Sequence, residues 1–354
     1  MTRFAFVIHP IEPKEAARRY PIAKYLPDRW IESMIARKRP MVVSKITGIR
    51  SITGEETEGW FIGCPLTPRL LTGGLPIEAV YERLEECARL AETEGAEIMG
   101  LGAFTSVAGD GGITLAERAK IGITTGNSYT TATAIEGLIK ACEAVGIMPG
   151  EATLGVVGAT GSIGKTCARM LAPDFAKTVV IGRDASRTGA IAADLPRATA
   201  STEMRDLLQA DAVVTVTSSD TAIIEPSHLK RGAVVCDVSR PRDVSGRVTT
   251  ARPDVLVIEG GVVSVPGNVE FGFDFGFPAH TAYACMSETM MLALEHRTGD
   301  YTLGKDVGVD QVQETLIWAK KHGFSLAGFR SFERAVEQSA IDRVREARRV
   351  PVPA

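Results

Sequence analysis

The stretch Leu154-Gly155-Val156-Val157-Gly158-Ala159-Thr160-Gly161-Ser162-Ile163-Gly164-Lys165 decides the fold class of this chain. A short apolar run ends at Gly158, and a helical pattern follows over residues 166–171. The three glycines permit a tight turn, a close approach of the backbone to a phosphate, and close packing of helix on strand. The first N–H groups of the helix would face a pyrophosphate. The stretch therefore predicts a dinucleotide site, with cofactor contacts at Gly158, Ala159, Thr160, Gly161, Ser162, Ile163 and Gly164.

Apolar runs that alternate with helical segments continue on the C-terminal side of this motif. We expect strands at residues 153–157, 178–181, 211–217, 233–237 and 255–258. Such alternation predicts an α/β fold: a Rossmann-type doubly wound parallel sheet, accompanied by a second α/β substrate domain. Ligands of such sheets bind at the carboxyl ends of the strands, so we expect further cofactor contacts at Thr217, Ser218 and Gly260.

The residues after the second strand indicate which dinucleotide is bound. An NAD site usually places an acidic residue here, bound to the ribose hydroxyls. This chain has Arg183 and Arg187 instead, and their planar guanidinium groups suit a 2′-phosphate. Asp184 lies between them, and a carboxylate pointing inward would repel that phosphate. The pattern favours NADPH over NADH as the cofactor.

At 354 residues the chain is long enough for two domains. We predict an N-terminal α/β substrate-binding domain over residues 1–150 and a Rossmann NADP-binding domain over 151–278. A C-terminal helical segment, 279–354, would carry the catalytic cysteine and pack back on the cleft. Within the first domain we expect strands at 4–8, 41–49 and 96–101 and a helical turn at 14–20.

Two strand exits in the first domain are rich in glycine and hydroxyl groups, at residues 102–106 and 124–128. Such loops are where α/β folds place ligand contacts, so Phe104, Thr105 and Asn127 are candidate substrate-binding residues. A turn or capping role remains open for each polar residue. Residues 37–39 form a basic run that is either a solvated turn or a docking patch for an acidic partner.

Residues 271–277 read Phe-Gly-Phe-Asp-Phe-Gly-Phe, and an extended conformation would place all four rings on one face. They either pack a core or form an apolar wall for a long acyl chain, with Phe273 as a substrate contact. A helix is expected over residues 280–296, with Cys285 in its second turn. A helix start lowers the pKa of a thiol, and the neighbours Ala282 and Ala284 are small, so Cys285 is the candidate catalytic residue.

Composition excludes several classes of protein. A net charge of −3 does not indicate a nucleic-acid binder, and we expect none as a partner. The six cysteines are scattered without C-x-x-C spacing or a nearby histidine pair, so no metal site is predicted, and a reducing cytoplasm is the expected location. No apolar run reaches the length of a membrane span, which leaves at most peripheral membrane contact through the basic C-terminal helix.

The ordered set of motifs resembles the long-chain acyl-[acyl-carrier-protein] reductases best known from cyanobacteria. The matching stretches are residues 101–106, 124–127, 156–164, 260–263, and Ala284-Cys285 with Glu288. The resemblance implies NADPH-dependent reduction of a fatty acyl thioester to a fatty aldehyde, with Cys285 as the catalytic cysteine. It also implies acyl carrier protein or acyl-CoA as the substrate donor, and an aldehyde-consuming enzyme as a further partner.

Two departures from the family pattern concern the substrate. The segment between Gly260-Gly261 and Cys285 is shorter and richer in Phe and Gly, and the chain beyond Ser331 continues as a basic helix. Both lie where the acyl chain or the carrier would fit. Two other functions stay open: a shikimate-dehydrogenase-like NADP-dependent oxidoreductase acting on a different carbonyl substrate, and a nucleotide-binding protein without catalysis.

Overall fold

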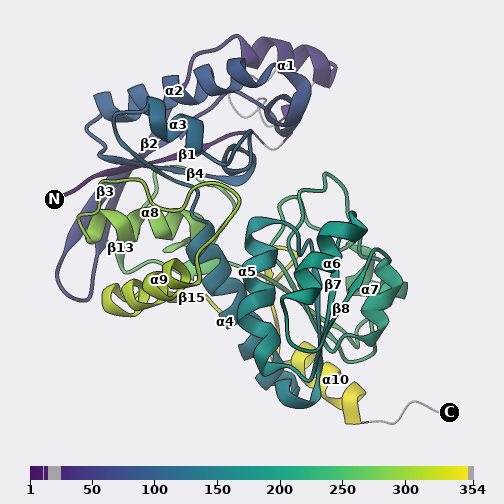
Figure 1. Ribbon diagram of the computed structural model, residues 1–354. Coiled ribbons are helices and arrows are strands. Elements are labelled where there is room, and N and C mark those ends of the chain that lie inside the picture. Colours follow the sequence, from purple (N-terminus) through teal and green to yellow (C-terminus); the bar gives the residue numbers. More distant parts are fainter. Residues whose placement is uncertain (11, 15–24, 350–354) are drawn as a thin grey trace. The chain divides into compact units, whose positions relative to one another are not determined.

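The computed structural model describes residues 1–10, 12–14 and 25–349, so all but the first residue of the helical turn expected at 14–20 lies outside the described residues. The chain forms two compact units, and each is built from several segments. Unit 1 comprises Met1–Gly126, Ser264–Lys305 and Glu314–Ser325; unit 2 comprises Asn127–Val263, Asp306–Gln313 and Leu326–Ala354. Figure 1 shows the elements of both units in the colours of the sequence.

Unit 1 is organised around a mixed six-stranded sheet in the order β13-β2-β3-β1-β4-β5. Strands β1, β3, β4 and β5 run parallel, while β2 is antiparallel to both of its neighbours. The apolar runs of β1 and β4 are buried on both faces, which is why the sequence alone identified them. The strands are β1 (Phe4–Ile8), β2 (Met41–Arg50), β3 (Glu56–Gly63), β4 (Ile98–Leu101), β5 (Gly122–Thr124) and β13 (Gly267–Glu270).

Helices cover both faces of this sheet (Figure 1). Alternate strand residues such as Ala5, Val7 and Trp60 form one core with α2 (Ile77–Thr93) and α3 (Ile113–Arg118). The opposite face carries α8 (Ala284–Leu294), since a Cβ at Gly100 of β4 would overlap the Thr289 hydroxyl of that helix. A shorter helix, α1 (Asp28–Ala36), precedes β2, and the short strand β14 (Thr281–Tyr283) precedes α8.

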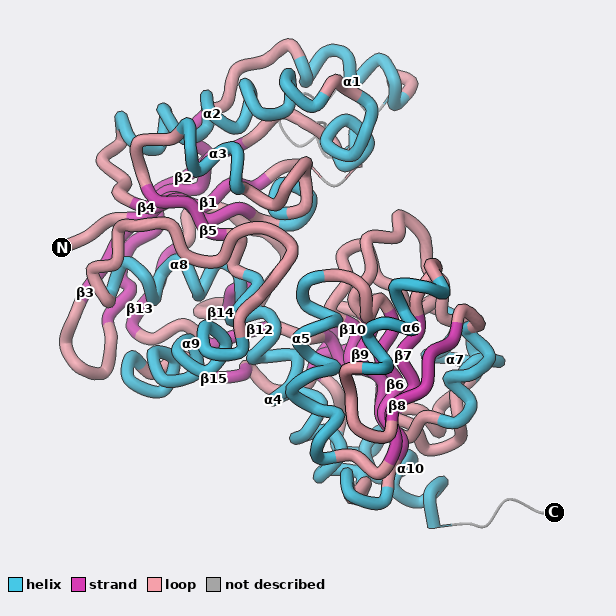
Figure 2. Tube along the Cα trace, in the orientation of Figure 1, coloured by secondary structure: helices cyan, strands magenta, loops and turns pink. Residues whose placement is uncertain are grey.

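Unit 2 contains the predicted Rossmann sheet: six parallel strands in the order β11-β10-β9-β6-β7-β8 (Figure 2). Read from β8 and numbered along the chain, the order is 3-2-1-4-5-6, and it reverses between β6 and β9. The doubly wound α/β fold is therefore confirmed. The strands are β6 (Thr153–Val157), β7 (Lys177–Ile181), β8 (Ala198–Ser201), β9 (Ala212–Thr215), β10 (Val234–Asp237) and β11 (Leu256–Glu259).

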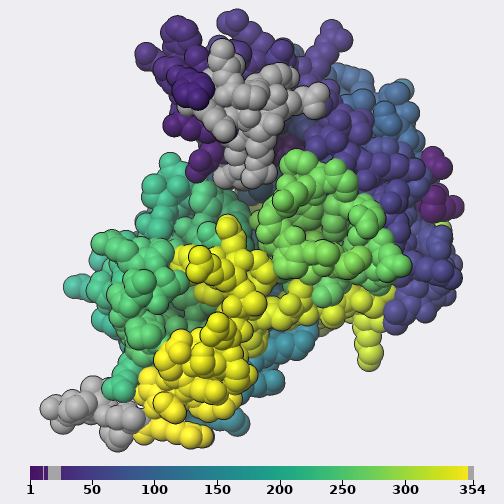
Figure 3. All heavy atoms as spheres, turned by 180° about the vertical axis from the view of Figure 1, so that it is seen from behind, coloured from purple at the N-terminus to yellow at the C-terminus, as the bar shows by residue number. Residues whose placement is uncertain are grey.

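Two cores flank this sheet. Residues of α4 (Asn127–Val145), α5 (Ser162–Leu171) and α10 (Gln338–Arg349) pack on one side, together with part of α6 (Ala185–Ala193). Val248 of α7 (Arg247–Ala251) belongs to the other core. Helix α10 lies on the outside of this unit (Figures 1 and 3).

In the described part of the chain, the strands outside these two sheets, apart from β14, and the one further α-helix are β12 (Val262–Ser264), α9 (Val309–His322), β15 (Ser325–Leu326), β16 (Arg330–Ser331) and β17 (Arg334–Ala335).

The observed units differ from the three continuous segments expected from the sequence. Helix α4, expected in the N-terminal domain, belongs to unit 2 because its apolar residues pack on the Rossmann sheet. Residues 264–305, divided in the prediction between the second and third segments, return to unit 1. The helix expected from residue 280 begins at Ala284, because residues 281–283 form β14 and His280 has a positive φ of 59°.

Candidate functional site

The glycine-rich turn of unit 2 joins β6 to α5. Gly158 has a φ of +80°, and a Cβ there would overlap the carbonyl oxygen of Val216, at the carboxyl end of β9. A Cβ at Gly164 would overlap the carbonyl oxygen of Gly158, so only glycine lets α5 pack so close to the turn. Gly161 caps the helix, and no side chain among the described residues caps it. The first N–H groups of α5 are thereby left for a phosphate at the point where the strand order reverses.

The two arginines expected to bind a 2′-phosphate follow β7 and are both exposed. The guanidinium of Arg187 donates to the carbonyl of Thr160 at 3.2 Å, so this side chain reaches the glycine turn. Asp184 accepts the backbone N–H of Arg187 at 3.0 Å and caps α6. One oxygen of its carboxylate is therefore engaged as the N-cap of its own helix.

A buried carboxylate that the sequence analysis missed holds the loop that follows β9. Asp243, fully buried, accepts hydrogen bonds from the hydroxyls of Thr215, Thr217 and Ser239 and from the backbone N–H of Thr217. These contacts fix the loops that follow β9 and β10. The signal in the sequence is the polar run 237–243 directly after an apolar strand, where a carboxylate has backbone and hydroxyl donors within reach.

The structure gives Thr217, Ser218 and Gly260 different surroundings. The hydroxyl of Thr217 is committed to Asp243 at 2.5 Å, while Ser218 lies beside it at the carboxyl edge of the sheet and is exposed. A Cβ at Gly260 would lie 2.8 Å from a methyl group of Val238, so close packing on the segment after β10 accounts for this glycine. Ser218 therefore remains the candidate of the three for a direct cofactor contact.

Cys285 lies in the first turn of α8 rather than the second, directly after the N-cap residue Tyr283 and Ala284. Every other residue of α8 is buried, and all five other cysteines of the chain are buried as well. The helix packs so tightly on the strand exit that a Cβ at Gly126 would overlap the Cβ of Cys285. Cys285 is therefore the single partly exposed residue of a buried helix, at the carboxyl end of β5.

Burial raises the pKa of the Cys285 thiol to about 12, against the smaller opposing effect of the backbone N–H groups of Met286 and Cys285 itself. The expected lowering by the helix start is therefore present but outweighed. The negative charge of Glu288 raises the pKa further. The thiol is protonated at neutral pH, and its reaction must release a proton.

Glu288, one turn after Cys285, holds α8 in place. Its Oε1 accepts the hydroxyl of Thr124 at 2.6 Å and the hydroxyl of Thr302 at 3.0 Å. The backbone N–H of Thr302 in turn donates to the Thr124 hydroxyl at 3.3 Å. This buried set connects β5, α8 and the loop that follows the helix, and it fixes where Cys285 stands relative to the strand exit.

The four alternating phenylalanines of residues 271–277 form an aromatic cluster, but not along an extended strand. Gly272 and Gly276 have positive φ values of 63° and 87°, which bend the chain. Phe271, Phe273 and Phe275 surround the buried ring of Phe61 on β3, at centroid distances of 6.0, 6.3 and 5.6 Å. The cluster continues through Phe277 to Tyr283, whose rings are 4.4 Å apart. It thus reaches the N-cap of the cysteine helix.

The other substrate candidates stand at strand exits. Phe104 is buried after β4, and the hydroxyl of Thr105 donates to the carbonyl of Gly102 at 2.7 Å, within its own turn. Asn127 is buried at the start of α4. His9, which the sequence analysis missed, follows β1: its Nε2 accepts the N–H of Phe104 at 3.2 Å, and burial lowers its pKa to about 4. His9 is neutral and positions the Phe104 turn.

Within the described residues, no group of three or more histidine, cysteine, aspartate or glutamate side chains is arranged to hold a metal ion. No helix of that part of the chain combines the length and hydrophobicity needed to cross a membrane.

The match of this chain to a protein-family profile is confined to one of its two units. The profile of the Shikimate / quinate 5-dehydrogenase family matches residues 144–258, which lie within unit 2. Aminotransferase PigE of a Serratia strain is 30% identical over 306 residues, which cover 83% of this chain and 35% of PigE. The chain thus spans about a third of that relative's length. A long-chain acyl-[acyl-carrier-protein] reductase of Synechococcus elongatus is 26% identical over 301 residues, covering 80% of this chain and 87% of the reductase.

Among solved structures, glutamyl-tRNA reductase of Methanopyrus kandleri aligns with a TM-score of 0.32 and 17% identity, covering 79% of this chain and 59% of that one. D-lactate dehydrogenase of Escherichia coli aligns with a TM-score of 0.34 and 11% identity, covering 73% of this chain and 82% of the dehydrogenase. The sheet order, the glycine turn and the family profile together establish that unit 2 has the NAD(P)-binding fold of oxidoreductases.

Proposed function

We propose that this protein reduces a long-chain fatty acyl thioester to a fatty aldehyde, with NADPH as the reductant and Cys285 as the acylated residue. The observation that carries the proposal is the setting of Cys285. It is the partly exposed residue of an otherwise buried helix, and an aromatic cluster extends to the N-cap of that helix. The similarity to the Synechococcus elongatus reductase, which covers most of this chain, supports the same reaction.

Acyl transfer to Cys285 is balanced in protons. The sulfur attacks the thioester carbonyl, the carbon–sulfur bond of the donor breaks, and the proton of Cys285 leaves with the departing thiol. The high pKa of the thiol makes this coupled transfer necessary, because little thiolate exists at neutral pH. The backbone N–H groups of Cys285 and Met286 stabilise the sulfur as charge develops on it.

The residues of the glycine turn fit NADPH. Gly158 and Gly164 allow the tight turn that brings the start of α5 to the carboxyl end of β6, and Arg187 reaches the carbonyl of Thr160 in that turn. NADPH held at this turn would supply a hydride for the acyl carbon; with one proton from solvent, the products would be the aldehyde, NADP⁺ and the free thiol of Cys285. Arg183 and Arg187 hold the 2′-phosphate in this proposal.

The family profile favours a second candidate function. A shikimate-dehydrogenase-like enzyme would transfer the hydride directly to or from a carbonyl substrate, without a covalent intermediate. The profile covers residues 144–258, all in unit 2, and does not reach Cys285 in unit 1. Replacement of Cys285 by alanine separates the two functions, because it abolishes acyl transfer and leaves direct hydride transfer intact.

The proposal includes an enzyme that consumes the aldehyde. One relative is named an aminotransferase, and this chain corresponds to about a third of it. Aminotransferases deliver an amino group to a carbonyl compound, so a released aldehyde is a chemically suitable substrate for such an enzyme. An aldehyde released beside its consumer would also be withheld from side reactions.

The direct test follows NADPH oxidation by its absorbance while a hydrazine reagent traps the aldehyde. Hexadecanoyl-acyl carrier protein and hexadecanoyl-CoA serve as the two donors. We expect one aldehyde per NADPH from the wild type and none from Cys285→Ala, while Cys167→Ala, which alters a buried cysteine of unit 2, retains activity. Equal rates for the wild type and Cys285→Ala would overturn the proposal.

A further inference from the structure

The surface of helix α1 in unit 1 combines aromatic and basic side chains. Its exposed apolar residues are Tyr25, Trp30 and Met34, with 87%, 59% and 49% of their surface accessible. The basic residues around them are Arg29, Arg37, Lys38 and Arg39. We define these seven residues as the α1 surface. Tryptophan, tyrosine, methionine and arginine are the residue types most enriched at protein interfaces.

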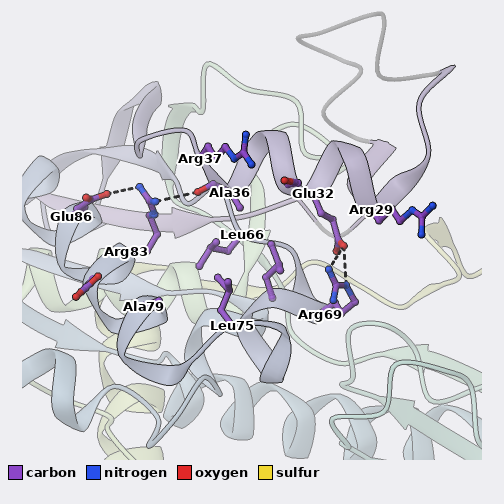
Figure 4. A pocket seen from close by; sticks show the side chains of 13 residues that line it. Arg29, Glu32, Ala36, Arg37, Leu66, Arg69, Leu75, Ala79, Arg83 and Glu86 are labelled. Carbon is purple, nitrogen blue, oxygen red and sulfur yellow. Dashed lines mark hydrogen bonds and ion pairs between the residues drawn. The ribbon is translucent and has the colours of Figure 1, made fainter.

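Beside the α1 surface lies a hollow of about 460 Å³ between α1, the start of α2 and the segment after β3 (Figure 4). Its floor is apolar and includes Leu66 and Leu75. Arg29 and Arg37, at the two ends of α1, line its rim, and neither forms an ion pair within the described part of the chain. The rim therefore offers two cations to an incoming group.

The helix that carries this surface is held rigidly. Glu32, on its buried side, accepts the hydroxyl of Thr67 at 2.5 Å and two N–H groups of Arg69 at 2.8 and 2.5 Å. Arg83 of α2 donates to the carbonyl of Ala36 at 3.1 Å (Figure 4). Because α1 is fixed at its middle and at its end, Trp30 and Met34 stand on a held helix, and Arg37, Lys38 and Arg39 directly follow its fixed end.

We propose that the α1 surface docks an acidic acyl carrier protein that delivers the thioester. The inference rests on the proposed function and names the part of unit 1 that binds the carrier. Charge is the argument: the chain as a whole carries −3, yet the two carboxylates of residues 25–39 accompany four cations, and one of those carboxylates, Glu32, is committed to Arg69. A negatively charged partner is attracted by this local excess of cations.

The sheet places this surface on the reactive side of unit 1. The first residue of β2, Met41, pairs with Gly63 at the carboxyl end of β3, so α1 ends at that edge of the sheet. Cys285 packs on Gly126, which follows β5 at the same edge. Four strand spacings separate β2 from β5, roughly 19 Å across the sheet. The long flexible pantetheine arm of a carrier suits such a separation.

An anionic membrane is the competing occupant, because basic and aromatic side chains also favour lipid surfaces. Helix α1 has only nine residues, and the rim of the hollow also carries the carboxylates Glu82 and Glu86. A bilayer would meet these carboxylates with like charge, whereas a protein partner can match them with donors. The mixed rim favours a protein.

The test compares two donors of the same acyl group: hexadecanoyl-acyl carrier protein, and hexadecanoyl-pantetheine, which has neither the protein nor a phosphate. The triple variant Arg37→Glu/Lys38→Glu/Arg39→Glu should raise KM for the carrier substrate about tenfold or more. Its kcat, and both parameters for the pantetheine substrate, should stay within about twofold of the wild type. Trp30→Ala should act in the same direction.

The matched control is Arg343→Glu/Arg349→Glu, which reverses two cations on α10 of unit 2 and should leave the carrier KM unchanged. Equal effects on both donors, or an equal effect of the control, would overturn the docking proposal. Titration calorimetry with the carrier lacking its acyl group measures docking without turnover. Wild-type binding that the triple variant loses, with no aldehyde from either donor, would uphold docking and reject the proposed function. Binding of anionic vesicles through α1, without carrier binding, would overturn docking.

Discussion

The hydroxyl of Thr124 donates to Glu288 at 2.6 Å and so fixes the end of β5 to the helix that begins at the candidate nucleophile. The same carboxylate raises the pKa of Cys285 through its negative charge. One residue thus positions the thiol and also adds to the increase of its pKa that burial causes. These two effects can be separated experimentally.

Glu288→Gln retains an oxygen that can accept both hydroxyls but removes the charge. We therefore expect the pKa of Cys285 to fall, measured as the pH dependence of iodoacetamide alkylation. Glu288→Ala removes the acceptor as well and leaves two buried hydroxyls without it, which should cost about 1–3 kcal/mol in the free energy of unfolding. An unchanged alkylation profile in Glu288→Gln would show that Glu288 does not act on the thiol through charge.

Gly126→Ala should destabilise the protein and hinder access to Cys285. An alanine at this position would have to adopt a positive φ of 73°, and its Cβ would overlap the Cβ of Cys285. Gly146→Ala is the matched control, because Gly146 has a φ of 76° with nothing within 4 Å of a new Cβ. We expect Gly126→Ala to lose about 1–3 kcal/mol more than the control in denaturant unfolding. Equal losses would mean that backbone conformation alone requires this glycine.

Arg183→Ala/Arg187→Ala should raise KM for NADPH about 10- to 100-fold, since each lost charge-assisted hydrogen bond is worth more than a neutral one. The KM for NADH should change far less, because that cofactor lacks the 2′-phosphate. Arg169→Ala, an exposed arginine in the last turn of α5, is the control. If both cofactors are affected alike, these arginines do not recognise the phosphate.

Asp237 predicts a pH dependence of stability. Burial raises the pKa of this carboxyl to about 6, and the nearby Asp243 adds to the effect, against the backbone N–H of Val244 and the charge of Arg240. The unfolded chain loses this proton at lower pH than the folded protein does. The free energy of unfolding should therefore fall by about 3 kcal/mol as the pH rises from about 4 to about 6. Asp237→Asn should lack this component of the slope; parallel curves for both proteins would contradict it.

Phe273→Ala tests the aromatic cluster. Removing this ring, which packs on Phe61 at 6.3 Å, should shift the preference of the enzyme among acyl chains of different length. The measurement is kcat/KM for a series of acyl thioesters, from medium to long chains, with thermal unfolding recorded in parallel. A lower stability with an unchanged chain-length profile would assign Phe273 to the core of unit 1 instead of the acyl site.

The sequence predicted unit 2 better than unit 1, for physical reasons. The glycine turn and the strands beside it depend on local spacing, so Gly158 and β6 were placed correctly from the sequence. Strand β8 was missed because it is a partly exposed edge strand without an apolar run. The high pKa of Cys285 arises from burial by segments far apart in the chain, and local reasoning about the helix start predicted the opposite direction.

The partners of buried carboxylates were also beyond the sequence. The hydroxyls of Thr217 and Thr124, which Asp243 and Glu288 accept, lie far from them in the sequence and are brought to them only by the fold. Unit 1 is built from separate segments of the chain, and residues 264–305 return to it. This arrangement follows from packing that no local sequence pattern encodes. The aromatic run was recognised from its alternation, but its bend required the positive φ values of Gly272 and Gly276.

The central claim is that Cys285 carries the acyl group during turnover. Intact-protein mass spectrometry after mixing with hexadecanoyl-acyl carrier protein, without NADPH, tests it most directly. We predict a mass increase of one hexadecanoyl group on the wild type, absent from Cys285→Ala, that disappears with release of aldehyde when NADPH is added. An adduct that persists in Cys285→Ala, or aldehyde formation by that variant, would contradict the account.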